Sequence, residues 1–348
     1  MSGARTSRDA AEPADTDGPR APTRRELLAG AAAAGAWLAL SGLTPAAAAA
    51  PAPARASAPT PAGAPSAAPA AAPRRGGGPP FTISLAEWSL HRALQAGVLG
   101  PGDFARVARQ DFGLDAIEHV STFLAAHVRN PPALAELRRR ADDLGVASLL
   151  IMVDGEGALG DPDESARRAA VENHVKWLAA ASVLGCHSIR VNAYGGGSPD
   201  EHAARAADSL HRLAVEADGH GLNVLVENHG GLSSNGAWLA GVMRRADHPR
   251  VGTLPDFGNF SASGAERYDR YQGVAEMMPF ARAVSAKSYA FDGAGNETTI
   301  DYARMLRLVL AAGYHGHLGI EYEGDQLSER EGIAATLALL RRLAVQLT

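Results

Sequence analysis

Four short apolar segments of the sequence end in side chains that could bind a cation or move a proton. The residues are Glu227 in VLVENHGG, Asp256 in GTLPDFGNF, Ser285 and Lys287 in AVSAKSY, and Glu321 in LGIEYEG. If the segments are successive parallel strands of a closed barrel, their carboxyl ends meet at one rim. Carboxylate oxygens are ligands that hard divalent cations prefer. The pattern therefore predicts a cation site and, with it, an enzyme.

The direction of the side chains supports this prediction. Successive side chains of a strand point to opposite faces, so Glu227 shares its side with His229, and Ser285 shares its side with Lys287. Charged groups that end otherwise apolar strands are costly to bury without partners. A cation or a polar ligand between them would lower that cost.

Eight strand-like segments position these residues. They span residues 81–88, 114–120, 146–154, 188–194, 222–229, 251–257, 283–289 and 317–323. Most begin as continuous apolar runs, which is typical of parallel strands buried on both faces. Helix-like segments lie between them, and Gly145, Gly185 and Gly221 are expected to cap three of these in the left-handed conformation. Eight alternating units predict the α/β class and a (β/α)8 TIM barrel.

The first 80 residues have a different composition. Arg24 and Arg25 precede a moderately apolar stretch, residues 27–43, which at about 17 residues is at the short limit for a membrane span. We therefore interpret residues 1–45 as an N-terminal region with a twin-arginine signal peptide rather than as a membrane anchor. The protein would use the twin-arginine export machinery during secretion and would be periplasmic or extracellular.

Two further segments follow this region. Residues 46–80 are almost entirely Ala, Pro, Ser and Gly, a composition that predicts a disordered linker. Residues 81–348 are about 270 residues, the usual size of one barrel domain. The single cysteine, Cys186, excludes a disulfide within the chain. The formal charge of −5 argues against a nucleic-acid partner.

At these residues the chain resembles the sugar phosphate isomerase/epimerase family with the xylose-isomerase-like barrel. The resemblance covers residues 81–348 and is carried by VLVENHGG, PDFGN, AKSY and GIEYEG. It implies one divalent metal ion (Mn²⁺, Mg²⁺, Co²⁺ or Zn²⁺) with Glu227, Asp256 and Glu321 as ligands. It also implies that Glu227 and Glu321 act as acid and base when a proton moves beside a carbonyl. Lys287 would then hold a developing oxyanion or a substrate hydroxyl.

The sequence departs from the family at two positions. Ser285 stands where the family has a metal-binding histidine, and Asn259 stands where it has a histidine three residues after the aspartate ligand. Because a hydroxyl is a poorer ligand than imidazole, three alternatives stay open. The site could be weaker with Ser285 as a ligand, it could use a water molecule, or it could recruit His229.

Further residues near the strand ends are candidates for substrate binding: Trp88, His91, Glu118, Asn192, His229 and Asn259. Trp88 could stack on a sugar or pack against the barrel. In contrast, His174, His202 and His211 lie inside helix-like segments and are expected on solvated faces.

The leading hypothesis is an exported, metal-dependent sugar isomerase or epimerase that acts through an enediolate on a small carbohydrate. A homo-oligomer is left open. A lyase or hydratase on oxidised (keto) glycosides would use the same metal site and proton abstraction. A non-catalytic sugar-binding barrel is the alternative from another class. Cleavage of phosphodiesters is disfavoured, because it needs a basic surface that this acidic chain lacks.

Overall fold

A computed structural model describes residues 78–261 and 267–347. The predicted signal peptide of residues 1–45 and nearly all of the predicted linker of residues 46–80 lie outside the described residues. Within the described ranges, no helix combines the length and the apolar character that crossing a membrane requires.

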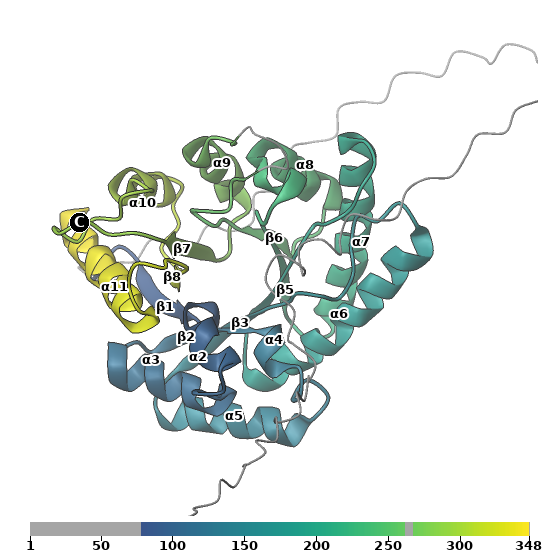
Figure 1. The fold of residues 1–348 in the computed structure, drawn as a ribbon. Helices are drawn as coiled ribbons and strands as arrows, with labels where there is room; N and C mark the ends of the chain where they lie inside the picture. The colour runs from purple at the N-terminus through teal and green to yellow at the C-terminus, as the bar shows by residue number, and fades with distance from the viewer. Residues whose placement is uncertain (1–77, 262–266, 348) are drawn as a thin grey trace, which may run out of the picture. The chain divides into compact units, whose positions relative to one another are not determined.

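The described chain alternates strands and helices, as predicted (Figure 1). The strands are β1 (Thr82–Ala86), β2 (Ala116–Val120), β3 (Ala147–Met152), β4 (Ser188–Val191), β5 (Asn223–Glu227), β6 (Val251–Leu254), β7 (Val284–Ser288) and β8 (His317–Tyr322). The longer helices are α3 (Phe104–Phe112), α5 (Pro131–Asp143), α6 (Glu164–Leu184), α7 (Pro199–Asp218), α8 (Gly236–Ala246), α9 (Arg270–Met277), α10 (Tyr302–Ala311) and α11 (Glu329–Gln346). Each strand falls inside its predicted segment, so the predicted (β/α)8 TIM barrel is confirmed.

All neighbouring strands pair in parallel, in the order β6-β5-β4-β3-β2-β1-β8-β7. Isolated parallel bridges, Thr253 to Ala281 and Asp256 to Ser285, join the remaining pair of edges, β6 and β7. The backbone N–H of Ser285 donates to the Pro255 carbonyl at 3.0 Å across this seam. The sheet thus closes on itself, and the helices form a ring around it (Figure 1).

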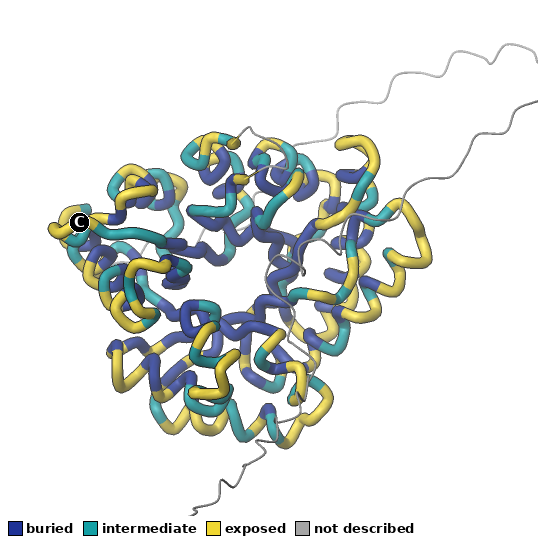
Figure 2. Tube along the Cα trace, in the orientation of Figure 1, coloured by how far each residue is buried: buried dark blue, intermediate teal, exposed yellow. Residues whose placement is uncertain are grey.

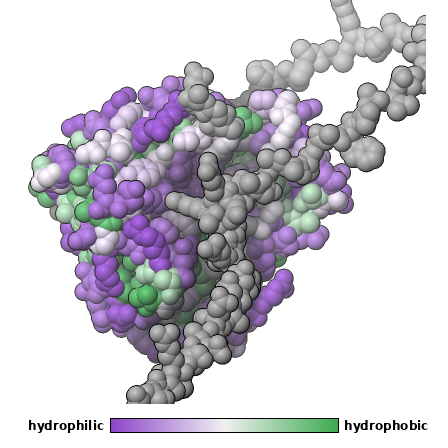
Figure 3. Space-filling model, in the orientation of Figure 1, coloured by the Kyte–Doolittle hydropathy of each residue, from purple (hydrophilic) through white to green (hydrophobic). Residues whose placement is uncertain are grey.

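Alternation along the strands divides the core into two parts. One part fills the space between strands and helices and includes Val224 and Val226 of β5. The other lies inside the barrel and includes Leu225 of the same strand and Leu254 of β6. Figure 2 shows the strands as a buried ring whose surrounding helices expose their outer faces. Figure 3 shows hydrophilic residues over much of the face that it presents.

Helix ends follow the expected signals. Asp163 and Ser198 accept backbone N–H bonds at the first turns of α6 and α7. Gly185 ends α6 with a φ of 82°, as its position before a strand predicted. The prediction for two helix histidines was wrong. His174 and His202 are buried, and each has a ring nitrogen bonded to a backbone carbonyl, so they pack against the barrel instead of facing solvent.

Candidate active site and metal centre

Three carboxylates converge at the carboxyl ends of the strands. Glu227 is the last residue of β5, Asp256 follows β6, and Glu321 lies near the end of β8. One carboxylate oxygen from each lies within 4.8 Å of the others, and all three side chains are buried. They point inward because each is an even number of residues from an inward-facing position, such as Leu225 or Leu254. The strand ends therefore assemble the predicted acidic cluster.

Strand β7 adds a hydroxyl and an ammonium group to this cluster. Ser285 Oγ lies 2.6 Å from Asp256 Oδ2 and 3.0 Å from Glu321 Oε2. Lys287 Nζ donates to Glu321 Oε1 at 2.7 Å and lies 3.3 Å from Glu323 Oε2. Burial alone would lower the pKa of Lys287, but the carboxylates around it raise its pKa well above the ordinary value. Lys287 is therefore held in its protonated form by the carboxylates around it.

Arg190 of β4 approaches the cluster from the other side. Its Nε lies 2.8 Å from Glu227 Oε2, and its Nη1 donates to Asp154 Oδ1 at 2.8 Å. The Nε–H does not point at Glu227, so this contact is a charge pair without hydrogen-bond geometry. Asn259 Nδ2 donates to the other oxygen, Glu227 Oε1, at 2.9 Å. Among the described residues, Glu227 Oε2 thus has no hydrogen-bond donor.

The balance of buried charge fits a divalent cation. Carboxyl groups outnumber cations in the barrel interior: Glu118, Glu227, Asp256 and Glu321 are buried with Arg190 and Lys287, and Glu87 after β1 is also buried. Buried charges need compensation by an opposite charge or a proton. Without a cation, burial raises the pKa of Glu227 to about 7 and the pKa of Asp256 to about 7.

The donor set determines how such a cation would be held. Glu227, Asp256 and Glu321 would supply carboxylate oxygens, and Glu227 Oε2 is free of hydrogen-bond donors. Ser285 lies between two of these ligands, so its hydroxyl or a water molecule could complete the set. His229 does not belong to the acidic cluster found in the described residues. Its Nδ1 lies 2.5 Å from the Tyr194 hydroxyl.

Glu118 lies deeper in the barrel than its prediction as a substrate-binding residue implied. It accepts a hydrogen bond from Ser84 Oγ at 2.6 Å and is buried. A β-carbon at Gly319 would lie 2.6 Å from the Glu118 carboxylate oxygens, so this glycine leaves the room that the carboxyl group occupies. Gly319 precedes Glu321 by two residues, which places Glu118 one inward position below the cluster. The register of β2 against β3 shifts beside Glu118.

Two other predicted residues, Trp88 and His91, form the aromatic part of the rim. Their rings stack at a centroid distance of 4.8 Å, and Trp88 also lies 6.1 Å from Phe123. The indole N–H of Trp88 donates to Glu323 at 2.6 Å. Trp88 is only half-buried, so its stacking and packing interpretations are compatible. His91 Nδ1 bonds to the Trp88 carbonyl at 2.7 Å, and this bond orients the ring against the indole.

The remaining predicted residue, Asn192, belongs to a group with Asp154, Arg190 and Tyr194, of which the sequence did not single out Arg190 and Tyr194. Its Nδ2 donates to Asp154 at 2.6 Å, beside the bond from Arg190 to the same oxygen. Tyr194 bonds to His229 at the same end of the barrel. The available signal was Arg190, a single charged residue inside an apolar strand and of equal parity with Asn192.

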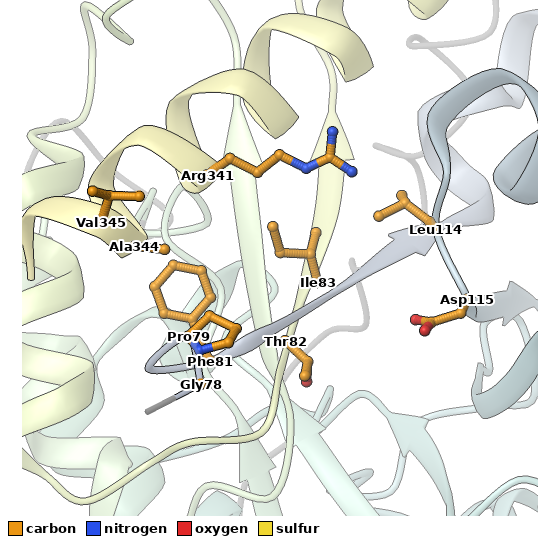
Figure 4. A pocket seen from close by; sticks show the side chains of 10 residues that line it. All are labelled: Gly78, Pro79, Phe81, Thr82, Ile83, Leu114, Asp115, Arg341, Ala344 and Val345. Carbon is orange, nitrogen blue, oxygen red and sulfur yellow. The ribbon is translucent and has the colours of Figure 1, made fainter. Parts of the chain in front are cut away.

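A separate hollow lies away from this chemistry. A cavity of about 540 Å³ is lined by Phe81, Thr82 and Ile83 at the start of β1 and by Arg341, Ala344 and Val345 of α11 (Figure 4). The acidic cluster lies at the carboxyl ends of the strands, whereas this cavity adjoins an amino end. It therefore contributes nothing to the cluster.

Comparison with known proteins agrees with the geometry. A family model described as "Xylose isomerase-like TIM barrel" matches residues 105–343. A D-psicose 3-epimerase, solved in the presence of D-fructose, is 13% identical with a TM-score of 0.59 and covers 76% of this chain and 99% of its own. A 3-keto-D-glucoside 4-epimerase from E. coli is 17% identical with a TM-score of 0.57 and covers 75% and 99%.

A xylose isomerase domain protein from Planctomyces limnophilus is similarly related in structure. It is 17% identical with a TM-score of 0.58, and it covers 77% of this chain and 97% of its own. At these identities the likeness establishes the fold alone. No curated protein matches the sequence.

Replacing Glu118 with glutamine tests the charge balance inside the barrel. Burial raises the pKa of Glu118 from 4.5 to about 7, so the folded chain holds a proton that the unfolded chain releases. In EDTA, the free energy of unfolding should fall as pH rises from about 4.5 to about 7, by up to about 3 kcal/mol from this group. Glu118→Gln should remove that part of the slope in urea unfolding.

The matched control for this experiment is Glu216→Gln on the exposed side of α7. It makes the same chemical change outside the barrel and should keep the wild-type slope. Equal slopes in wild type and Glu118→Gln would contradict the prediction.

Proposed function

The chain belongs to the xylose isomerase-like TIM barrel family, and on that premise we propose that it is a metal-dependent sugar isomerase or epimerase. The observation that carries this proposal is the cluster of Glu227, Asp256 and Glu321, whose oxygens lie within 4.8 Å of one another. Moving a proton beside a carbonyl requires a base, an acid and a positive charge near the oxygen. The sugar epimerases among the similar structures support a small carbohydrate as the substrate.

The residues of the cluster divide the reaction between them. Glu227 would take the proton from the carbon next to the carbonyl, because its Oε2 has no hydrogen-bond donor among the described residues and so is free to accept a proton. Because Lys287 holds the pKa of Glu321 low, Glu321 would first have to gain a proton from solvent. Its transfer to the other side of the enediolate would give an epimer or a shifted carbonyl. When bound, a divalent cation would supply Lewis-acid stabilisation of the charge that develops on the oxygen.

Lys287 has two roles in this scheme. Burial alone would raise the pKa of Glu321, but the charge and hydrogen bond of Lys287 hold it below the ordinary value. The same ammonium group lies 3.8 Å from Asp256 and would stabilise a nearby substrate oxygen as negative charge develops there. Asn259 holds Glu227 by one oxygen and so orients the proposed base.

Export is a separate part of the proposal. Arg24 and Arg25, followed by the apolar residues 27–43, support a twin-arginine signal, which would place the enzyme in the periplasm or outside the cell. These residues lie outside the described part of the chain.

Metal content is the first test of the cluster. The purified full-length chain should contain close to one equivalent of a divalent ion by elemental mass spectrometry. Glu227→Ala and Asp256→Ala should each lose it, because each removes a charged ligand from a buried set of three. Asp208→Asn on α7, which breaks an exposed ion pair, should retain it. No metal even after incubation with Mn²⁺ or Co²⁺ would refute the proposed centre.

Proton exchange with solvent tests the reaction. In heavy water, the enzyme should place deuterium beside the carbonyl of a substrate sugar, as followed by NMR on a panel of aldoses and ketoses. Glu227→Gln and Glu321→Gln should each slow exchange by about 10²-fold or more, the usual contribution of a general base or acid. Glu216→Gln should match wild type. Release of a cleaved fragment in place of a deuterated sugar would identify an elimination and overturn the isomerase assignment.

Substitution of both signal arginines tests export. Arg24→Lys together with Arg25→Lys should leave the full chain inside the cell, as measured by immunoblotting of fractions, because the export machinery reads the arginine pair. Arg20→Lys, outside the pair, is the control and should be exported normally. Normal export of the double variant would exclude the twin-arginine route.

A further inference from the structure

Both buried cations of the barrel are already paired with carboxylates. Among the described residues, Arg190 and Lys287 are the only buried arginine and lysine. Arg190 contacts Asp154 and Glu227, each at 2.8 Å. Lys287 contacts Glu321 at 2.7 Å and also has Glu323 and Asp256 within 4 Å. Neither cation is left to bind an anionic group of a substrate.

Three arginines near the loops that follow the strands are also engaged. Arg92 donates to the Gly324 carbonyl at 3.1 Å, and Arg205 donates to the Gly160 carbonyl at 3.2 Å. Arg270 lies 3.5 Å from the Phe257 carbonyl. These guanidinium groups hold loops that follow β8, β3 and β6. They therefore stabilise the open end of the barrel and are not directed at a ligand above the cluster.

The groups that remain for a substrate are uncharged. Tyr194 is 42% exposed, and its hydroxyl is paired with the half-buried ring of His229. Asn192 Oδ1 is buried and has no hydrogen-bond partner among the described residues. A sugar hydroxyl can donate to Asn192 Oδ1 and can also bond to the Tyr194–His229 pair. A phosphate has only acceptor oxygens, and Asn192 Oδ1 would repel them.

Asp154 completes this arrangement. Its side chain is 37% exposed, so its charge reaches solvent beyond the carboxyl end of β3, while Oδ1 accepts hydrogen bonds from both Arg190 and Asn192. Burial alone would raise the pKa of Asp154, but the charge of Arg190 holds it below the ordinary value. Asp154 is thus a fixed negative charge that screens the guanidinium group from an incoming anion.

We propose that Asp154 is a specificity-determining residue that makes this site select uncharged sugars over phosphorylated ones. The inference rests on the proposed sugar isomerase or epimerase function and adds its substrate class. Even with a divalent ion bound among the carboxylates, a phosphate dianion would find Arg190 and Lys287 already paired and would meet the exposed charge of Asp154 beside Arg190. A neutral sugar has no such penalty and gains hydrogen bonds from Tyr194, His229 and Asn192.

Removing the charge of Asp154 tests the proposal. Asp154→Asn keeps the size of the side chain but leaves Arg190 with only Glu227 as a charged partner. Inorganic phosphate is the first probe, titrated into the Mg²⁺-loaded full-length proteins and followed by ³¹P NMR. The variant should bind phosphate about tenfold more tightly than wild type. Asp208→Asn, which changes the net charge equally on the outer face of α7, should bind it like wild type.

Matched sugars give the second measurement. D-fructose and D-fructose 6-phosphate are compared in wild type and Asp154→Asn by ligand-observed NMR. Wild type should favour the neutral sugar by about tenfold or more, and the variant should lose most of that preference. Equal or stronger binding of the phosphate ester by wild type, or an unchanged phosphate affinity in the variant, would overturn the role of Asp154.

The proposed function and the proposed substrate class are overturned by different results. Deuterium exchange into a phosphorylated sugar but not into neutral ones would overturn the substrate class and keep the isomerase function. Absence of exchange with either class would overturn the proposed function itself, whereas the phosphate titration still reports on Asp154.

Discussion

The interior of the barrel holds more carboxylates than cations, and the rest of the site follows from this excess. Carboxyl groups that are out of water must gain hydrogen bonds, opposite charge or a proton. Ser84 gives Glu118 a hydrogen bond, and Lys287 gives Glu321 an opposite charge. Burial raises the pKa of Asp256 and so favours a bound proton there. The same unrelieved charge that makes these groups costly also makes them suited to bind a cation and to exchange a proton.

Much of the fold could be predicted because its signals are local. Apolar runs such as the one in residues 222–229 mark strands buried on both faces, and β5 indeed occupies Asn223–Glu227 within that segment. The acidic cluster could be predicted because side chains alternate between the two faces of a strand and because the carboxyl ends of barrel strands meet at one rim. In contrast, the roles of Arg190 and Asp154 depend on which side chains meet across the interior, and no spacing in the sequence encodes that. Likewise, the burial of His174 depends on how α6 packs against the sheet.

Ser285 shows how one substitution is absorbed by its surroundings. The family resemblance places a histidine here, whereas the hydroxyl bonds to Asp256 and lies beside Glu321. Lys287, two residues on, supplies the positive charge that holds Glu321. Gly258 leaves room for this lysine, because a β-carbon there would lie 2.7 Å from Lys287 Cγ. A cation bound here would therefore meet three carboxylates and, where the family resemblance places an imidazole, a compact hydroxyl.

The acidic cluster lies at the seam between β6 and β7, where the barrel closes. These strands are joined only by isolated bridges, and Asp256 and Ser285 stand on opposite sides of the join. The Ser285 hydroxyl donates to Asp256 Oδ2 at 2.6 Å, which adds a side-chain hydrogen bond to the backbone bridges across this seam. A cation or ligand that binds Asp256 would therefore also affect the hydrogen bond that closes the barrel between β6 and β7. One residue, Asp256, thus serves both the proposed cation site and the closure of the barrel, so binding at the cluster is coupled to the stability of the β6–β7 seam.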